Sequence, residues 1–129
     1  MEVRSDLKYS EDHEWIRIEG NTVVLGITDY AQNSLSDIVY VEVPEVGTIV
    51  DAGEEVGNIE SVKAVAALYS PLAGEVVKVN KSLEDEPELV NTDPYDNGWI
   101  MEIEILTGEL ERADLMNDDE YEEYIAKLK

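Results

Sequence analysis

Turn-forming residues recur at short intervals between residues 48 and 106, and this spacing narrows the choice of fold more than any other feature. Glycine and proline interrupt the apolar segments there at Gly53, Gly57, Pro71, Gly74, Pro87, Pro94 and Gly98. Tight turns favour both residues, whereas the central strands of a sheet exclude proline. The pattern predicts many short strands at close spacing, as in a small antiparallel sandwich or barrel.

Alternation of apolar and polar residues locates three strand regions. An N-terminal hairpin is predicted from residues 15–18 and 22–25, with a turn at 19–21 between them. A half-buried strand is predicted over 39–43, with its three valines on one face. Residues 99–105 form the last predicted strand, with the side chains at odd positions on one face.

Apolar residues at helical spacing indicate two helices. Thr28 and Asp29 are typical of a helix start, and a short apolar face follows at Ala31, Leu35 and Ile38. The end of the chain predicts an amphipathic helix that starts at a group of capping and acidic residues, and its apolar face is Tyr121, Tyr124, Ile125 and Leu128.

The length of 129 residues suffices for one domain with a real core. We expect a single domain over residues 1–129, with a β core at about 22–106 and a C-terminal helical segment at 109–128. The predicted class is mainly β with small α additions.

The chain is strongly acidic, with 31 acidic and 9 basic residues and a net charge of −22. Such a charge repels phosphate backbones and anionic membranes, so we expect no nucleic-acid partner and no membrane partner. It favours attraction to basic proteins, and it also serves solubility; composition leaves both readings open. The chain contains no cysteine, so any thiol chemistry has to arrive on a cofactor.

The N-terminus has neither the apolar core of a signal peptide nor the basic character of a transit peptide. A cytoplasmic protein is therefore expected, with a mature mitochondrial protein as the weaker alternative.

The stretch NIESVKAVAAL, residues 58–68, places a lysine at the centre of an apolar run. With a strand on either side, Lys63 lies at the tip of a short hairpin, where Val62, Val65 and Leu68 anchor the flanks and three alanines keep bulk away. This arrangement suits a lysine presented to another protein. An ordinary solvated lysine in a turn also fits the spacing and is what most exposed lysines are, so the residues alone leave both interpretations open.

His13, the only histidine, has no evident partner or pocket for acid–base catalysis, and we expect a hydrogen-bonded residue near the start of the first strand. The segment DPYDNG at 93–98 has oxygen ligands but not the spacing of an EF-hand, so a turn is predicted and no metal site. SLEDEPEL at 82–89 is interpreted as a solvated acidic loop, and Trp15 and Trp99 as core residues.

Longer sequence motifs surround the lysine. IESVKAV, LYSPLAGEVVKVN and PELVNTDPYDNGW, with HEW from residue 13, GITDYAQ from residue 26 and DIVYVEVPEVG from residue 37, closely resemble the glycine cleavage H-protein family. The resemblance runs in one order from about Leu7 into the C-terminal helix.

The resemblance implies a barrel-sandwich hybrid of the lipoyl-domain type with flanking helices, and a carrier rather than an enzyme. It implies that lipoic acid is attached by an amide to Lys63. Glu60, Val62 and Ala64 match the motif that lipoylating enzymes recognise, whether a lipoate ligase or a lipoyl or octanoyl transferase.

The implied partners are three enzymes of glycine catabolism and one-carbon metabolism. A pyridoxal-phosphate glycine decarboxylase transfers an aminomethyl group to the carrier, and a tetrahydrofolate-dependent aminomethyltransferase removes it. A flavin-containing dihydrolipoyl dehydrogenase then reoxidises the dithiol with NAD. We expect the carrier to be a monomer.

By the same resemblance, the HEW region lies near the groove that shelters the loaded arm. This makes Glu14, and with it His13, a candidate contact for the carried amine. Two positions depart from the family pattern: Ser36 replaces a usual glycine, and Ala66-Ala67 replaces a commoner Ser-Asp. The second change removes an acidic group that could have contacted the arm.

Three other functions compete with this interpretation. A lipoate relay that serves another lipoate-dependent complex is the nearest. A biotin carrier shares the hairpin lysine but usually flanks it with methionines, whereas Val62 and Ala64 stand here. A Schiff-base enzyme needs a desolvated amine or one whose pKa is lowered, which an exposed hairpin on an acidic protein does not offer.

Overall fold

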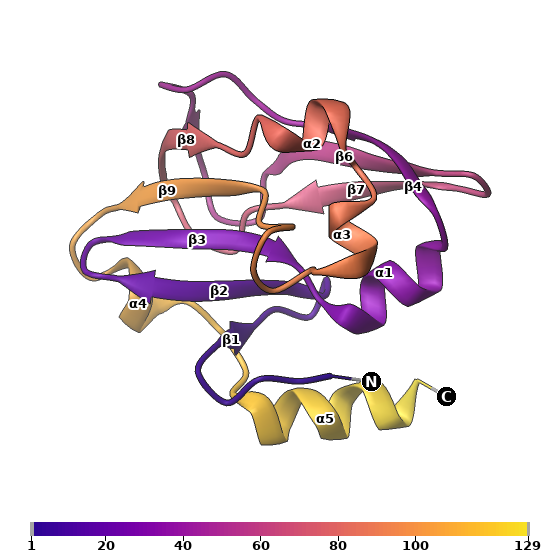
Figure 1. The fold of residues 1–129 in the computed structure, drawn as a ribbon. Coiled ribbons are helices and arrows are strands. Elements are labelled where there is room, and N and C mark those ends of the chain that lie inside the picture. The colour runs from indigo at the N-terminus through magenta and orange to yellow at the C-terminus, as the bar shows by residue number, and fades with distance from the viewer. Residues whose placement is uncertain (1, 129) are drawn as a thin grey trace.

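The computed structural model describes residues 2–128, whose strands form two antiparallel β-sheets (Figure 1). The larger sheet of this described chain has six strands, in the order β1 (Lys8–Tyr9), β2 (Glu14–Glu19), β3 (Thr22–Ile27), β9 (Met101–Ile105), β8 (Gly74–Val79) and β5 (Ile49–Val50). The smaller sheet has three, in the order β4 (Ile38–Glu42), β6 (Glu55–Ser61) and β7 (Val65–Tyr69).

One cluster of buried apolar side chains joins the two sheets. The members that are at most 1% exposed include Ile16, Val23, Leu25, Ile59, Leu68, Val76, Met101 and Ile103. In β9 the odd positions are buried while Glu104 is exposed, as the alternation predicted. The burial of these side chains supplies the main driving force for closing one sheet on the other.

The predicted N-terminal hairpin is confirmed as β2 and β3, which pair from Glu14↔Ile27 to Glu19↔Thr22. Residue 26 of this hairpin has to be glycine, because a Cβ atom there would lie 2.5 Å from the Trp15 ring. The same ring is fully buried and donates a hydrogen bond from Nε1 to the carbonyl of Pro94 at 2.9 Å.

Strand β4 does not follow the predicted alternation. A register shift lies between Ile38 and Tyr40, so Ile38 and Val41 enter the core while Val39 and Tyr40 are about half exposed. The prediction that all three valines of residues 39–43 share a buried face was therefore wrong for Val39. A bulge adds a residue to one strand and turns the side chains around it to the other face.

Helix α1 (Asp29–Leu35) begins where predicted. The Thr28 hydroxyl oxygen accepts the N–H of Ala31 at 3.2 Å and caps the helix. Ile38 was expected on its apolar face but instead begins β4.

The acidic stretch after β8 was interpreted as a loop, and this was wrong in part. It begins with the single-turn helix α2 (Ser82–Asp85), and a second single-turn helix, α3 (Leu89–Thr92), starts at its last residue. Each places one apolar side chain in the core, Leu83 and Val90. The turn predicted next, at residues 93–98, is confirmed.

The C-terminal segment forms two helices, α4 (Glu109–Arg112) and α5 (Asp118–Lys127). At the start of α5 the predicted cap is a full capping box: Asn117 and Glu120 each accept the other's backbone N–H at 2.9 Å. Figure 1 shows α5, in yellow, running beneath the larger sheet beside the N-terminal segment.

A second buried cluster lies where α5 meets the larger sheet, and its members are Leu7, Tyr9, Trp15, Val24, Tyr95, Tyr121 and Ile125. None of the helices in residues 2–128 has the length and apolar character needed to cross a membrane.

Candidate functional site

Lys63 lies in the hairpin between β6 and β7 and is exposed to solvent. Figure 1 shows this hairpin projecting from one end of the molecule. Its two strands pair from Glu55↔Tyr69 to Glu60↔Val65, so the loop that carries the lysine is short. The structure thus confirms the predicted position of Lys63 at a hairpin tip.

Hydrogen bonds to Ser61 hold the turn around Lys63. The Ser61 N–H donates to the Ala64 carbonyl at 2.8 Å. The Ser61 hydroxyl oxygen accepts the N–H groups of Lys63 and Ala64 at 3.3 and 3.1 Å. Ser61 lies within the IESVKAV motif, and no role was predicted for it from the sequence. A serine hydroxyl often accepts backbone N–H groups two or three residues further on and so favours a turn, and this preference could have predicted the role of Ser61.

The valines on either side of the lysine do not anchor the hairpin as predicted. Val62 and Val65 are 67% and 65% exposed, whereas Leu68 is buried. The first residue after β6 is held by its backbone instead, because the Val62 N–H donates to the Asp37 carbonyl at 3.0 Å. The two valines therefore form an apolar surface next to the lysine.

The motif residue Glu60 lies on the outer face of the smaller sheet. Its cross-strand partners are Tyr40 in β4 and Val65 in β7, both exposed. Ala67, one of the two alanines that depart from the family pattern, is exposed on the same strand as Val65. Tyr40, Val65 and Ala67 are thus exposed around Glu60 beside the hairpin tip.

Glu14, the other candidate, is a buried carboxylate at the start of β2 and is only 1% exposed. Its Oε1 accepts the Ser10 hydroxyl at 2.5 Å, and its Oε2 accepts the backbone N–H of Tyr69 at 3.2 Å. Burial raises the pKa of Glu14 to about 7, although both hydrogen bonds act to lower it. A carboxylate with spare acceptor positions and a pKa near neutrality is suited to binding a cation or a proton.

His13 is hydrogen-bonded near the start of the strand, as expected. Its Nδ1 lies 2.9 Å from the Tyr121 hydroxyl, and its ring packs against Tyr30, Tyr121 and Tyr124. Burial lowers the pKa of His13. The ring therefore contacts α1 and α5, whereas the Glu14 side chain reaches β7.

The structure does not place Glu14 beside Lys63. Glu14 contacts Tyr69, the last residue of β7, while Lys63 precedes the first residue of that strand. The length of β7 therefore separates the two groups.

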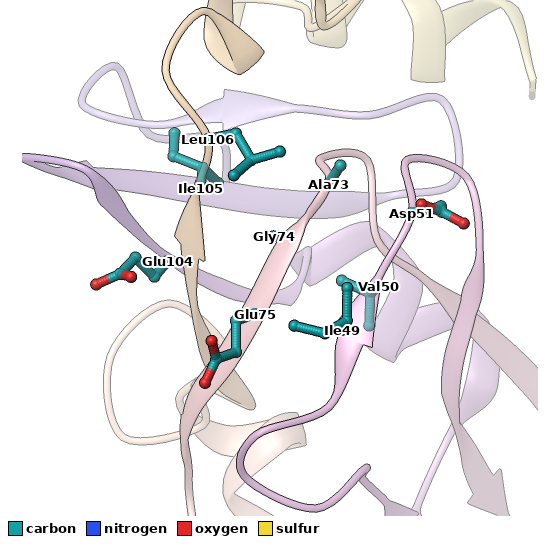
Figure 2. Close-up of a pocket in the computed structure, with 9 residues that line it drawn as sticks. All are labelled: Ile49, Val50, Asp51, Ala73, Gly74, Glu75, Glu104, Ile105 and Leu106. Carbon is teal, nitrogen blue, oxygen red and sulfur yellow. The ribbon is translucent and has the colours of Figure 1, made fainter.

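A shallow pocket of about 190 Å³ lies along β5, β8 and β9 (Figure 2). Aliphatic side chains such as Ile49 and Ile105 line it, and Glu75 and Glu104 stand opposite each other on adjacent strands at its rim. Figure 1 shows β9 ending on the side away from the β6–β7 hairpin. None of the candidate site residues predicted from the sequence lines this pocket, so the candidate functional site consists of the lysine hairpin and Glu14.

An exposed lysine on a hydrogen-bonded hairpin of a two-sheet β structure is the arrangement expected of a carrier protein. The family model described as glycine cleavage H-protein matches residues 7–128, and the chain belongs to this family.

Curated relatives and a solved structure agree with this assignment. The chain is 50% identical over 127 residues to the glycine cleavage system H protein of Staphylococcus haemolyticus, covering 98% of this chain and 100% of the relative. It is 50% identical over 128 residues to that of Listeria monocytogenes serotype 4a, covering 97% and 99%. The crystal structure of a glycine cleavage system H protein from Mycobacterium marinum matches with a TM-score of 0.85 at 37% identity, covering 97% of this chain and 98% of that one.

These findings confirm the resemblance, the mainly β fold and the carrier function in the glycine cleavage system. H proteins are non-catalytic lipoyl carriers, and membership of the system implies the P, T and L proteins as partners.

Proposed function

We propose that Lys63 is the residue that carries lipoic acid, joined through an amide to its Nζ. The observation that carries this proposal is the exposed lysine on a turn fixed by Ser61, which gives an acylating enzyme access to the amine and the arm a rigid root. The residues present fit the group, because the amide removes the lysine charge and lets the arm lie on apolar surface such as Val62 and Val65.

The lipoylating enzyme, a lipoate ligase or a lipoyl or octanoyl transferase, reads Glu60, Val62 and Ala64 around the lysine. The exposure of Val62 supports this role, because an apolar side chain open to solvent gains by burial against a partner. When bound, lipoic acid supplies the two sulfurs that a chain without cysteine lacks.

The proposed partners are glycine decarboxylase, the aminomethyltransferase and dihydrolipoyl dehydrogenase. A net charge of −22 steers the carrier toward basic surfaces around the entrances of their active sites. Tethering keeps the cargo at an effective concentration of the order of millimolar for the next enzyme. The chain acts as one carrier domain and as a monomer, and the bacterial relatives support a cytoplasmic location.

Glu14 holds the cargo between enzymes in this proposal. Its buried carboxylate would accept a hydrogen bond from the ammonium of the aminomethyl group and keep water from it. Ser10 and Tyr69 orient the two carboxylate oxygens for this contact.

The attachment is tested by intact and peptide mass measurement after production with a lipoate ligase and lipoic acid. We expect one lipoyl adduct, confined to Lys63 and lost in Lys63→Ala. Lys81→Ala, which removes another exposed lysine, is the matched control and should keep the adduct. An unmodified protein, under conditions that lipoylate a control domain, would overturn the proposal.

The pathway is tested with the lipoylated protein and purified glycine decarboxylase, which should exchange labelled bicarbonate into glycine. Lipoylation without exchange would point to a lipoate relay. The Glu14 contact is tested by the lifetime of the loaded carrier in Glu14→Gln, which should be shorter than in the wild type. An equal lifetime would remove Glu14 from the site.

A further inference from the structure

The turn that leads from β1 into β2 contains His13 and ends at Glu14, the first residue of β2, and it closes through a residue in the left-handed backbone conformation. The Ser10 N–H donates to the Glu14 carbonyl at 2.9 Å, and the His13 N–H donates to the Ser10 carbonyl at 3.2 Å. His13 has a φ of 67°, which is unfavourable for a residue with a Cβ. Such a conformation persists only where surrounding contacts hold it.

Three tyrosines surround the His13 ring and hold it in place. The ring centroid lies 4.7 Å from that of Tyr30 in α1, 5.8 Å from that of Tyr121 and 5.6 Å from that of Tyr124, both in α5. The hydrogen bond between Nδ1 and the Tyr121 hydroxyl fixes the rotation of the ring.

Tyr121 is itself fully buried and fixed on two further sides. Its ring stacks on Tyr9, with centroids 4.5 Å apart and planes 7° from parallel. Its hydroxyl lies 2.7 Å from the hydroxyl of Thr28, the residue that caps α1. One buried hydroxyl therefore joins His13 to the start of α1.

The C-terminal segment also holds the backbone of the turn directly. The Tyr124 hydroxyl donates to the carbonyl of Glu11 at 3.0 Å. Tyr9 and Met116 exchange backbone hydrogen bonds of 2.9 and 2.7 Å. The C-terminal segment thus holds the turn at two points, at Tyr9 just before it and at Glu11 within it.

We propose that α5 positions the Glu14 carboxylate through His13, and that His13 and Tyr121 are positioning residues for the cargo contact. This inference rests on the role proposed above for Glu14. The link is the peptide between residues 13 and 14: the His13 carbonyl accepts the Thr28 N–H at 3.0 Å, so fixing the histidine fixes the start of β2. The C-terminal helix then acts on the arm site through backbone geometry, without touching the arm.

The test measures the side-chain carboxyl of Glu14 directly, in the full-length protein without lipoate. Carbon-13 NMR titration of labelled glutamate side chains gives the pKa of Glu14, whose signal is assigned by its absence in Glu14→Gln. Tyr121→Phe keeps the stacked ring and removes only the hydroxyl, whereas His13→Gly keeps the left-handed backbone accessible and removes the ring. We expect both to lower the Glu14 pKa from about 7 by at least about half a unit, because a loosened turn admits water to the carboxylate.

Ile125→Ala is the matched control, because it removes buried apolar volume from the same helix and leaves all three tyrosines around His13 in place. It should lower the midpoint of urea unfolding and leave the Glu14 pKa within about 0.2 of the wild type. Circular dichroism at the titration temperature confirms that each variant is folded. An unchanged Glu14 pKa in folded Tyr121→Phe and His13→Gly would overturn the proposal, as would an equal shift in Ile125→Ala.

The lifetime of the loaded carrier separates this inference from the proposed function. If Glu14→Gln shortens the lifetime, Tyr121→Phe should shorten it in the same direction by a smaller factor. If Glu14→Gln has no effect while Tyr121→Phe shifts the pKa, the positioning by α5 stands and the cargo role of Glu14 fails. A shorter lifetime in Glu14→Gln alone, with no shift of the pKa in Tyr121→Phe, supports the site and overturns the positioning.

Discussion

The Oε2 atom of Glu14 accepts the backbone N–H of Tyr69 at 3.2 Å, and this contact joins the first residue of β2 to the last residue of β7. The two strands belong to different sheets, so the hydrogen bond crosses between them at a buried carboxylate. A carboxylate in such a position is costly when ionised, because the surrounding protein solvates charge poorly. The carboxylate at this buried position therefore points to a role that an apolar side chain of similar size could not fill.

This carboxylate predicts a pH dependence of stability. The pKa of Glu14 is about 7 in the folded protein and ordinarily 4.5, so the folded state binds an additional proton between these values. The stabilisation from Glu14 is complete below about pH 4.5 and is lost as the pH rises through about 7, a change of the order of 3 kcal/mol. Urea unfolding from about pH 5 to about pH 8 should show a steeper fall for the wild type than for Glu14→Gln.

The comparison with Glu14→Gln matters because the other acidic groups titrate in both proteins. Only the difference between the two curves reports on residue 14. Parallel curves would mean that Glu14 is well solvated in the folded state, against its 1% exposure.

Local patterns in the sequence predicted the elements whose side chains repeat regularly. Strand β9 follows strict alternation and α5 has both an apolar face and a capping box, so each was found from its own residues. The lysine hairpin was also found, because small residues and strand formers surround Lys63.

The errors lie where tertiary contacts override the local pattern. Val39 belongs to a run of alternating valines, but the bulge against β6 turns it outward. Leu83 lies in the acidic stretch 82–89 and Val90 directly after it, and each is buried by a helix of a single turn, too short to show a helical period. The contact between Glu14 and Tyr69 joins residues 55 positions apart, and no local signal encodes it.

Ser61 is predicted to control how well Lys63 is presented. Ser61→Ala removes the acceptor for two N–H groups of the turn, so the lysine samples more conformations and the lipoate ligase encounters the reactive one less often. A loss of about 1 kcal/mol of turn stability would slow lipoylation about fivefold. Initial rates of adduct formation by mass spectrometry measure this. Ser61→Thr keeps the hydroxyl and should react nearly as fast as the wild type, and equal rates for all three proteins would contradict the prediction.

The exposed valines are predicted to contribute little to folding. Val62→Ala and Val65→Ala should change the free energy of unfolding by no more than about 0.5 kcal/mol, because both side chains are mostly in water. Leu68→Ala on the same hairpin should cost about 2 to 5 kcal/mol, because this side chain is 1% exposed. Urea unfolding of the three variants measures the contrast. A large loss in either valine variant would restore the anchoring role that the sequence suggested.

The capping box of α5 is predicted to stabilise the C-terminal helix measurably. Asn117→Ala removes the side-chain oxygen that accepts the Glu120 N–H at 2.9 Å, and it should cost about 1 kcal/mol in the free energy of unfolding. Asn117→Asp keeps an acceptor at the cap and should cost less, since a carboxylate also suits the positive end of the helix dipole. Urea unfolding gives the free energies, and amide hydrogen exchange locates the effect, which should be greatest in the first turn of α5. If Asn117→Ala is as stable as the wild type, the cap is dispensable and packing of Tyr121 and Ile125 alone holds the helix on the sheet.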